Sequence, residues 1–275
     1  MTDNAAREAG RREFVPGDLT LEAPIASGSQ SILSSMGGAG SATKHVAIAG
    51  NMGVGKSTLT AALSERLGAD AHYEDVADNP YLARFYEDMK RWSFHSQFTF
   101  LSQAFRQHGE ILRRERTCVQ DRTIYEHFHV FASSHFEQGL LDADEFNTLR
   151  LHFESLTQIV PGPDLMIYLR ASIPTLVDRI RGRDRSIEAN VQVAYLQGLE
   201  DRYERWMATY DASDVLIIDT DNIDINDADQ RETLLSLLEE RIAGRPVKAP
   251  FASLSKRRRE IKAAAAGAVG SAALA

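Results

Sequence analysis

Short apolar runs alternate along the middle of the chain with longer segments in which apolar residues recur every three or four positions. The runs predict buried strands, and the longer segments predict amphipathic helices. The predicted strands are 45–49, 71–74, 117–121, 165–169 and 214–218. The predicted helices are 56–67, 80–113, 123–136, 143–159, 173–182, 190–209 and 228–242. Strands separated by helices favour an α/β fold, with a parallel five-stranded sheet that helices cover on both faces.

Both ends of the chain lack this periodicity. Residues 1–43 finish in a run of Ser, Gly and Ala, and we expect them to form a disordered leader, with Met36 as an alternative first residue. Residues 247–275 contain a basic cluster at 256–259, then a tail rich in Ala, and we expect them to be a disordered, solvated tail. The sequence therefore predicts one folded domain over 44–246.

Composition excludes several classes of protein. Of the 275 residues 43% are apolar and 25% charged, which is ordinary for a globular protein, and the formal net charge of −8 does not favour a nucleic-acid partner. No apolar run is long enough to predict a membrane span. Cys118 is the only cysteine, which excludes internal disulfides and thiolate zinc sites. We expect a protein of the reducing cytoplasm that binds neither membrane nor nucleic acid.

The strongest functional motif follows the first predicted strand and opens the first predicted helix. Strand, glycine-rich turn and helix are the context of a phosphate-binding P-loop, in which backbone N–H groups and the helix N-terminus surround the phosphates. In such a loop Lys56 reaches the β- and γ-phosphates, and the Ser57 hydroxyl binds Mg²⁺. The predicted phosphate-binding residues are Gly50, Asn51, Met52, Gly53, Val54, Gly55, Lys56, Ser57 and Thr58.

Charged residues follow the next two strands, at the sheet edge where ligands of parallel α/β folds bind. Glu74 comes at the end of strand 71–74 and is the candidate general base for a substrate hydroxyl. Asp121 and Arg122 close strand 117–121. An Asp at this place is suited to Mg²⁺ or its water, and an Arg to bridging the base and the phosphates.

Two further segments point to a nucleotide substrate. Residues 179–188 are rich in Arg, which suits a lid that closes over phosphates. Residues 85–98 are dense in aromatic side chains and include Gln97, whose amide offers both a donor and an acceptor to a nucleobase. By contrast, His127, His129 and His135 do not share one helical face, so we expect no metal site among them.

Taken together, these stretches resemble the deoxynucleoside kinases, in particular the bacterial deoxyadenosine and deoxyguanosine kinases. The resemblance covers most of 44–225 and rests on the P-loop, the arginine-rich segment and four shorter stretches, 78–82, 91–94, 120–125 and 163–169. It implies a P-loop kinase fold, a homodimer, ATP or a related triphosphate as donor, Mg²⁺, and transfer of the γ-phosphate to the 5′-hydroxyl of a deoxynucleoside.

The resemblance also assigns roles to individual positions. Glu74 matches the catalytic base, Arg122 the catalytic arginine and Asp121 an acidic partner in the same motif. Tyr86 and Glu188 match the pair that holds the sugar 3′-hydroxyl, and Gln97, with Phe100 nearby, matches the base-binding site. On the donor side the matching positions are the lid arginines Arg179, Arg183 and Arg185 and the donor-base loop with Asp221, Ile223 and Asp224.

Two positions depart from this pattern. Relatives specific for purines or deoxycytidine usually carry an Arg where this chain has Ala104 and an Asp where it has His127. The pair that reads the base is therefore replaced, which leaves kinase chemistry untouched and base preference open. We expect deoxyadenosine or deoxyguanosine as the substrate, with thymidine or broad specificity as the alternative.

Two other functions compete with this expectation. A GTP-dependent switch normally reads guanine through an Asn-Lys-x-Asp stretch, which this chain lacks. A nucleoside-monophosphate kinase, thymidylate kinase included, needs cationic groups for a second phosphate on the acceptor side. Here that side offers Glu74, Tyr86 and Gln97 instead.

Overall fold

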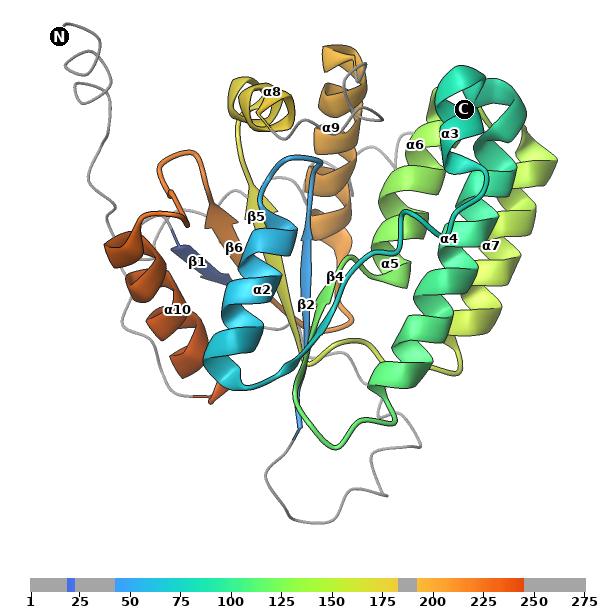
Figure 1. Ribbon diagram of the computed structural model, residues 1–275. Coiled ribbons are helices and arrows are strands. Elements are labelled where there is room, and N and C mark those ends of the chain that lie inside the picture. Colours follow the sequence, from blue (N-terminus) through green and yellow to red (C-terminus); the bar gives the residue numbers. More distant parts are fainter. Residues whose placement is uncertain (1–18, 23–42, 183–191, 245–275) are drawn as a thin grey trace, which may run out of the picture.

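The structure is a computed structural model, and it describes residues 19–22, 43–182 and 192–244. A six-stranded sheet runs through its centre, in the order β1-β6-β5-β2-β4-β3 (Figure 1). The strands are β1 (Leu19–Glu22), β2 (His45–Gly50), β3 (Asp70–His72), β4 (Cys118–Asp121), β5 (Leu165–Arg170) and β6 (Asp214–Asp219). Strands β2 to β6 are mutually parallel. The predicted α/β fold with five parallel strands is therefore confirmed.

Helices cover both faces of this sheet because residues along each strand alternate between them. Val46 and Ile48 of β2 face a core formed with α2 (Lys56–Leu67), α8 (Ile173–Arg181) and α10 (Ala228–Ile242). Ala47 and Ala49 face the opposite core, formed largely by α9 (Val193–Thr209). In the described part of the chain, no helix is both long and apolar enough to cross a membrane.

A third core lies beside the sheet and contains the remaining long helices. It is formed by α4 (Met89–Ile111), α5 (Ile124–Glu126), the π-helical segment η3 (His127–Ala132) and α7 (Ala143–Thr157). The short helices α3 (Leu82–Glu87) and α6 (Ser133–Glu137) flank it. In Figure 1 these helices stand to one side of the sheet, next to β4.

Two predicted helices are interrupted in the structure. The helix expected over 80–113 breaks at Asp88, whose backbone (φ −145°, ψ 86°) is not helical and whose side chain accepts a hydrogen bond from the Arg91 N–H and so caps α4. The helix expected over 123–136 is divided by η3. A π-helical turn within a helix is frequent at functional sites, and this one begins at His127.

The edge strand β1 corrects the prediction of a leader without regular structure over 1–43. Leu19–Glu22 pairs antiparallel with β6, with Leu19 opposite Ile218 and Glu22 opposite Val215. This pairing satisfies backbone groups that β6 would otherwise leave open at the edge of the sheet. A four-residue strand separated from the domain in the sequence carries too little periodicity to be predicted. The proposed tail at 247–275 and Met36 lie outside the described residues.

Candidate active site

The P-loop connects β2 to α2 through backbone conformations that require glycine. Gly50, Gly53 and Gly55 have φ values of 142°, 79° and 107°. A Cβ atom on Gly50 would lie 2.4 Å from the carbonyl oxygen of Leu169, and one on Gly53 would lie 2.8 Å from the Ile180 side chain. The loop is therefore compact against β5 and α8 as well as strongly curved. Its backbone leads directly into the N-terminus of α2, the favoured place for an anion.

Lys56 is buried beneath this loop, and its Nζ donates to the carbonyl oxygens of Gly50, at 2.8 Å, and Asn51, at 3.1 Å. Burial and the charge of Arg122 lower the pKa of Lys56, although Asp121, Glu126 and Glu74 act in the opposite direction. Neither contact is an ion pair, so the ammonium remains suited to a phosphate that enters the loop.

The Asn51 side chain does not face the phosphate position. Its Nδ2 donates to the Leu196 carbonyl at 3.0 Å and to Glu200 Oε2 at 2.9 Å, and its Oδ1 accepts from the Met52 N–H at 2.8 Å. Asn51 therefore fastens the loop to α9, a role that sequence reasoning did not assign.

Ser57 and Asp121, the two predicted metal-binding residues, are in contact near the carboxyl ends of β2 and β4. Ser57 Oγ donates to Asp121 Oδ2 at 2.6 Å. Asp121 is 3% exposed, and its Oδ1 is buried without a hydrogen-bond partner among the described residues. A hydroxyl and a carboxylate oxygen at the mouth of a P-loop are suited to a hard cation such as Mg²⁺. These residues therefore fit that ion.

Arg122 and Glu74 form the charged centre of the site. Arg122 Nε lies 2.9 Å from Glu74 Oε2, and the guanidinium lies 4.3 Å from the ring centroid of Phe131. Arg122 is the one described non-glycine residue with a positive φ, 71°, so its backbone is held in an unfavourable conformation. Burial opposes its charge, but Glu74 and Glu126 outweigh this and raise the pKa of Arg122 well above its ordinary value.

Glu126 belongs to this centre, although the sequence analysis did not predict it. It is fully buried, and its Oε1 lies 3.5 Å from Arg122 Nη1 and accepts hydrogen bonds from the Gly50 N–H, at 3.4 Å, and from the hydroxyl of Tyr203. Burial raises the pKa of Glu126, while Arg122 and Lys56 lower it. The only sequence signal was its position four residues after Arg122 in a short helix, which is not specific enough to identify it.

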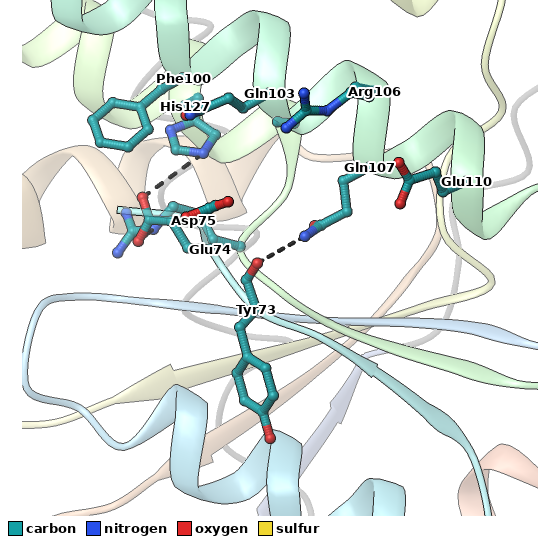
Figure 2. Close-up of a pocket in the computed structure, with 11 residues that line it drawn as sticks. Tyr73, Glu74, Asp75, Phe100, Gln103, Arg106, Gln107, Glu110 and His127 are labelled. Carbon is teal, nitrogen blue, oxygen red and sulfur yellow. Dashed lines mark hydrogen bonds and ion pairs between the residues drawn. The ribbon is translucent and has the colours of Figure 1, made fainter. Parts of the chain in front are cut away.

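Glu74 and Arg122 line a cavity of 470 Å³ between α4 and the loop after β3, and Figure 2 shows Glu74 in it. Phe100, Ala104 and His127, predicted to contact the nucleoside, line it too. The ring of His127 stacks on Phe100 with centroids 5.1 Å apart, and its Nε2 lies 3.9 Å from Glu74 Oε1. Burial, then the charges of Arg122 and Lys56, lower the pKa of His127 well below its ordinary value, so the ring is neutral.

Gln97 and Tyr86 are not among the residues that line this cavity. Gln97 is 3% exposed, and its Oε1 is buried without a hydrogen-bond partner among the described residues. A buried amide oxygen of this kind is available to a ligand. Tyr86 is half-buried on α3, with its ring 5.3 Å from that of Phe85.

The donor side has a second cavity, of 270 Å³, between the P-loop and the loop after β6. Ile223, Asp224 and Thr58 line it, as does Arg179, which donates to the carbonyl oxygens of Val54, at 3.2 Å, and of residue 220, at 2.7 Å. Asp221 is not among its lining residues. Its Oδ1 accepts from the backbone N–H of residue 172 at 2.8 Å, which fixes the loop to the start of α8.

The predicted lid arginines Arg183 and Arg185, and Glu188, which was predicted to hold the sugar 3′-hydroxyl, lie outside the described residues. The histidines that had been considered as metal ligands contact different side chains. His129 stacks on Trp206, and His135 bonds through Nδ1 with the hydroxyl of Ser93 at 2.7 Å. Within the described ranges, no three His, Cys, Asp or Glu side chains gather as a metal-binding group.

Comparison with known proteins agrees with this geometry. The family model for deoxynucleoside kinases matches residues 46–243. The chain is 37% identical over 193 residues to the deoxyadenosine/deoxycytidine kinase of Bacillus subtilis, a match that covers 69% of this chain and 89% of the relative. It is 32% identical to the deoxyguanosine kinase of the same organism, over 65% of this chain and 87% of that protein.

Solved structures give the same result. The structure of a deoxyadenosine kinase from M. mycoides with bound dATP superposes with a TM-score of 0.62 and 28% sequence identity. This match covers 71% of this chain and 99% of that one. The P-loop, the Arg122–Glu74 centre and these matches together show that the chain belongs to the deoxynucleoside kinase family and is a phosphotransferase.

Proposed function

We propose that this enzyme transfers the γ-phosphate of ATP to the 5′-hydroxyl of a purine deoxynucleoside, deoxyadenosine or deoxyguanosine. The observation that carries the proposal is the position of Glu74. Its carboxylate is paired with Arg122, and both line the cavity beside the P-loop that suits a nucleoside. The names of the similar kinases, which include deoxyadenosine and deoxyguanosine, support a purine. Membership of the deoxynucleoside kinase family argues against the two alternative functions, a GTP-dependent switch and a nucleoside-monophosphate kinase.

The chain's own residues account for the chemistry. Glu74 takes the proton of the 5′-hydroxyl as that oxygen attacks the γ-phosphorus, and the bond to the β-phosphate oxygen of the donor breaks. Arg122, held between Glu74 and Glu126, is placed to stabilise the charge that spreads over the equatorial oxygens. Lys56 exchanges its contacts with two backbone carbonyl oxygens for the phosphates of the donor.

Mg²⁺ is the expected metal ion, and Ser57 and Asp121 are the residues proposed to hold it, directly or through water. Bound there, the ion supplies charge neutralisation to the donor phosphates. Because Ser57 Oγ donates to Asp121 Oδ2, binding of the ion would require these two groups to exchange their hydrogen bond for contacts with the ion or its water. Calorimetric titration of Mg²⁺ in the presence of a nucleotide, in wild type and Asp121→Asn, measures this.

A homodimer is proposed from the family resemblance and from one exposed face. Phe98 on α4 is 39% exposed and Leu151 on α7 is 51% exposed. Phe98 stacks on His152 of α7 with ring centroids 4.6 Å apart, so the two helices present these side chains together. An exposed apolar face of this kind suits a second copy of the chain. Sedimentation of wild type and Leu151→Glu tests this directly.

The proposed cytoplasmic location is supported by the single cysteine and the expected ATP donor.

A substrate panel tests the proposed reaction. Purified enzyme is incubated with Mg²⁺, γ-labelled ATP and each of the four deoxynucleosides, and the products are separated. Phosphorylation of deoxyadenosine or deoxyguanosine to the 5′-monophosphate is expected. Label in none of the four products from correctly folded protein would refute the proposal, and a ranking led by thymidine would replace the purine assignment with the alternative that Ala104 and His127 leave open.

A further inference from the structure

The acceptor cavity continues along α4 beyond the residues that the kinase reaction uses. Its lining on that helix follows helical spacing, so one face of α4 forms a wall about 15 Å long over ten residues. The lining residues on α4 are Phe100, Gln103, Ala104, Arg106, Gln107 and Glu110. Figure 2 shows this row, with Phe100 and His127 at one end and Glu110 at the other.

Neither Ala104, which is part of this wall, nor His127, which lies at its end, supplies a fixed charge. Ala104 has no polar side-chain atom, and the ring of His127 is neutral and stacked on Phe100. The nitrogen Nε2 of His127 faces Glu74. Neither residue therefore supplies the paired donor and acceptor that a base edge requires.

Two residues of this row, Gln103 and Gln107, carry a side-chain amide, and the amide of Gln107 already has hydrogen-bond partners. Gln107 Nε2 donates to the carbonyl oxygen of Tyr73 at 2.7 Å, and its Oε1 accepts from Gln120 Nε2 at 2.8 Å. Gln103 is different, because its Oε1 is buried without a hydrogen-bond partner among the described residues. A buried acceptor left unpaired is costly and is expected to find its donor in a ligand.

We propose that Gln103 reads the edge of the nucleobase, in the place of the charged pair that Ala104 and His127 do not provide. The inference rests on the proposed deoxynucleoside kinase activity and names its substrate more closely. Gln103 Oε1 accepts a hydrogen bond from an exocyclic amino group, and Nε2 donates to the neighbouring ring nitrogen. At position 6 adenine carries an amino group beside the acceptor nitrogens N1 and N7, whereas guanine carries an oxo group there. The favoured substrate is deoxyadenosine.

Two substitutions at this position separate the two hydrogen bonds. Gln103→Leu keeps the size of the side chain and removes both. Gln103→Glu keeps the acceptors and removes the donor, so an amino group is still bound and an oxo group is repelled. Gln158→Leu is the matched control, since Gln158 is exposed at the end of α7, away from the cavity. For each protein, kcat and KM are measured with deoxyadenosine and deoxyguanosine, and nucleoside affinity by calorimetry.

The ratio of kcat/KM for deoxyadenosine over deoxyguanosine is the decisive quantity. Both substrates share the same 5′-chemistry, so a general effect on folding or on Glu74 cancels in the ratio. We expect wild type and Gln158→Leu to favour deoxyadenosine. Gln103→Leu is expected to lower this ratio by about 10- to 100-fold, mainly because KM for deoxyadenosine rises. Gln103→Glu is expected to preserve the ratio. Unchanged donor KM shows that the variants are folded.

The outcomes that would overturn the proposal differ from those that would overturn the kinase assignment. If wild type phosphorylates deoxynucleosides but Gln103→Leu keeps its ratio within about twofold, Gln103 does not read the base. If wild type prefers deoxyguanosine, or Gln103→Glu changes its preference to that substrate, the assignment of an amino-bearing base is wrong. If wild type phosphorylates no deoxynucleoside, the proposed function fails first, before any variant is made.

Discussion

Glu74 Oε2 lies 2.9 Å from Arg122 Nε, and this ion pair joins the loop after β3 to the end of β4. Glu74 is partly exposed to the cavity, whereas Arg122 is 5% exposed. The positive φ of Arg122 shows that the surrounding structure enforces its conformation. The carboxylate is therefore held on the open side of a rigid cationic group, which is the arrangement that a general base beside a phosphate site requires.

Glu74→Gln is expected to lower kcat by about 10²–10⁴-fold while nucleoside binding survives, because the amide keeps the shape of the carboxylate and loses its basicity. Steady-state kinetics with calorimetric binding of the nucleoside measures both quantities. Asp75→Asn is the matched control, since Asp75 lines the same cavity but its Oδ1 accepts only a local hydrogen bond from the Asp78 N–H. If kcat holds in Glu74→Gln and only KM rises, Glu74 is a binding residue.

Lys56→Ala is expected to lower turnover by at least about 10²-fold, because a charge directed at the transferring group acts mainly in the transition state. Lys44→Ala provides the comparison, since Lys44 immediately precedes β2 and pairs at 3.9 Å with Asp164. Rates are measured with saturating ATP and deoxynucleoside. Near-normal turnover in a folded Lys56→Ala protein would contradict the assignment of the P-loop.

Glu126→Gln tests the buried group that supports Arg122 and Gly50. Removing one partner of a buried ion pair usually costs about 3–5 kcal/mol of stability. We expect about 3 kcal/mol here, because Arg122 keeps Glu74 as a partner. Urea denaturation measures the change, and Glu154→Gln is the control.

The control pair has the same spacing as the buried one. Arg150 and Glu154 are also four residues apart, with atoms 2.8 Å apart, but both side chains are more than two-fifths exposed. An exposed pair of this kind contributes about 0.3–0.5 kcal/mol. Equal losses in the two variants would show that Glu126 does not carry the supporting charge.

The sequence predicted the elements whose signal is local. The P-loop, the five parallel strands, Asp121 and Arg122 lie where their motifs indicated, whereas Glu74 lies in the loop after β3, because that strand ends at His72 and not at residue 74 as predicted. Glu126 was missed because its partners, Gly50 and Tyr203, are 76 and 77 residues away in the chain. The break at Asp88 was missed because a single capping residue interrupts a long helical pattern.

The side-chain contacts of His127 likewise could not be predicted from the sequence. The family resemblance predicted that His127 lies at the nucleobase, but only the structure shows that its ring stacks on Phe100 and that its Nε2 faces Glu74. Side-chain direction depends on the π-helical turn that begins there, and that turn has no sequence signature. Position along the chain therefore predicted the cavity in which the residue lies, not the atom it faces.

The buried histidines make stability depend on pH. Burial lowers the pKa to about 4 for His45 and His129 and to about 3 for His108 and His135. In the unfolded chain these groups titrate near 6.5, so between about pH 4 and 6.5 the unfolded state binds more protons than the native state. Stability is therefore full above about pH 6.5 and falls as the pH decreases below it, by up to about 1.4 kcal/mol per pH unit for each histidine.

His108→Leu is the variant that isolates one of these protons, and Ile111→Val on the same helix is its control. Unfolding free energies measured in urea between pH 7.5 and 5 should decrease less steeply in His108→Leu than in wild type, by about 1.4 kcal/mol per pH unit in the acidic range. Ile111→Val removes one buried methyl group and no titrating group, so it should lower stability by about 0.5–1.5 kcal/mol at every pH and leave the slope unchanged. A wild-type stability that stays constant from pH 7.5 to 5 would contradict the neutral state of the buried histidines, because a proton taken up only on unfolding must appear as a slope.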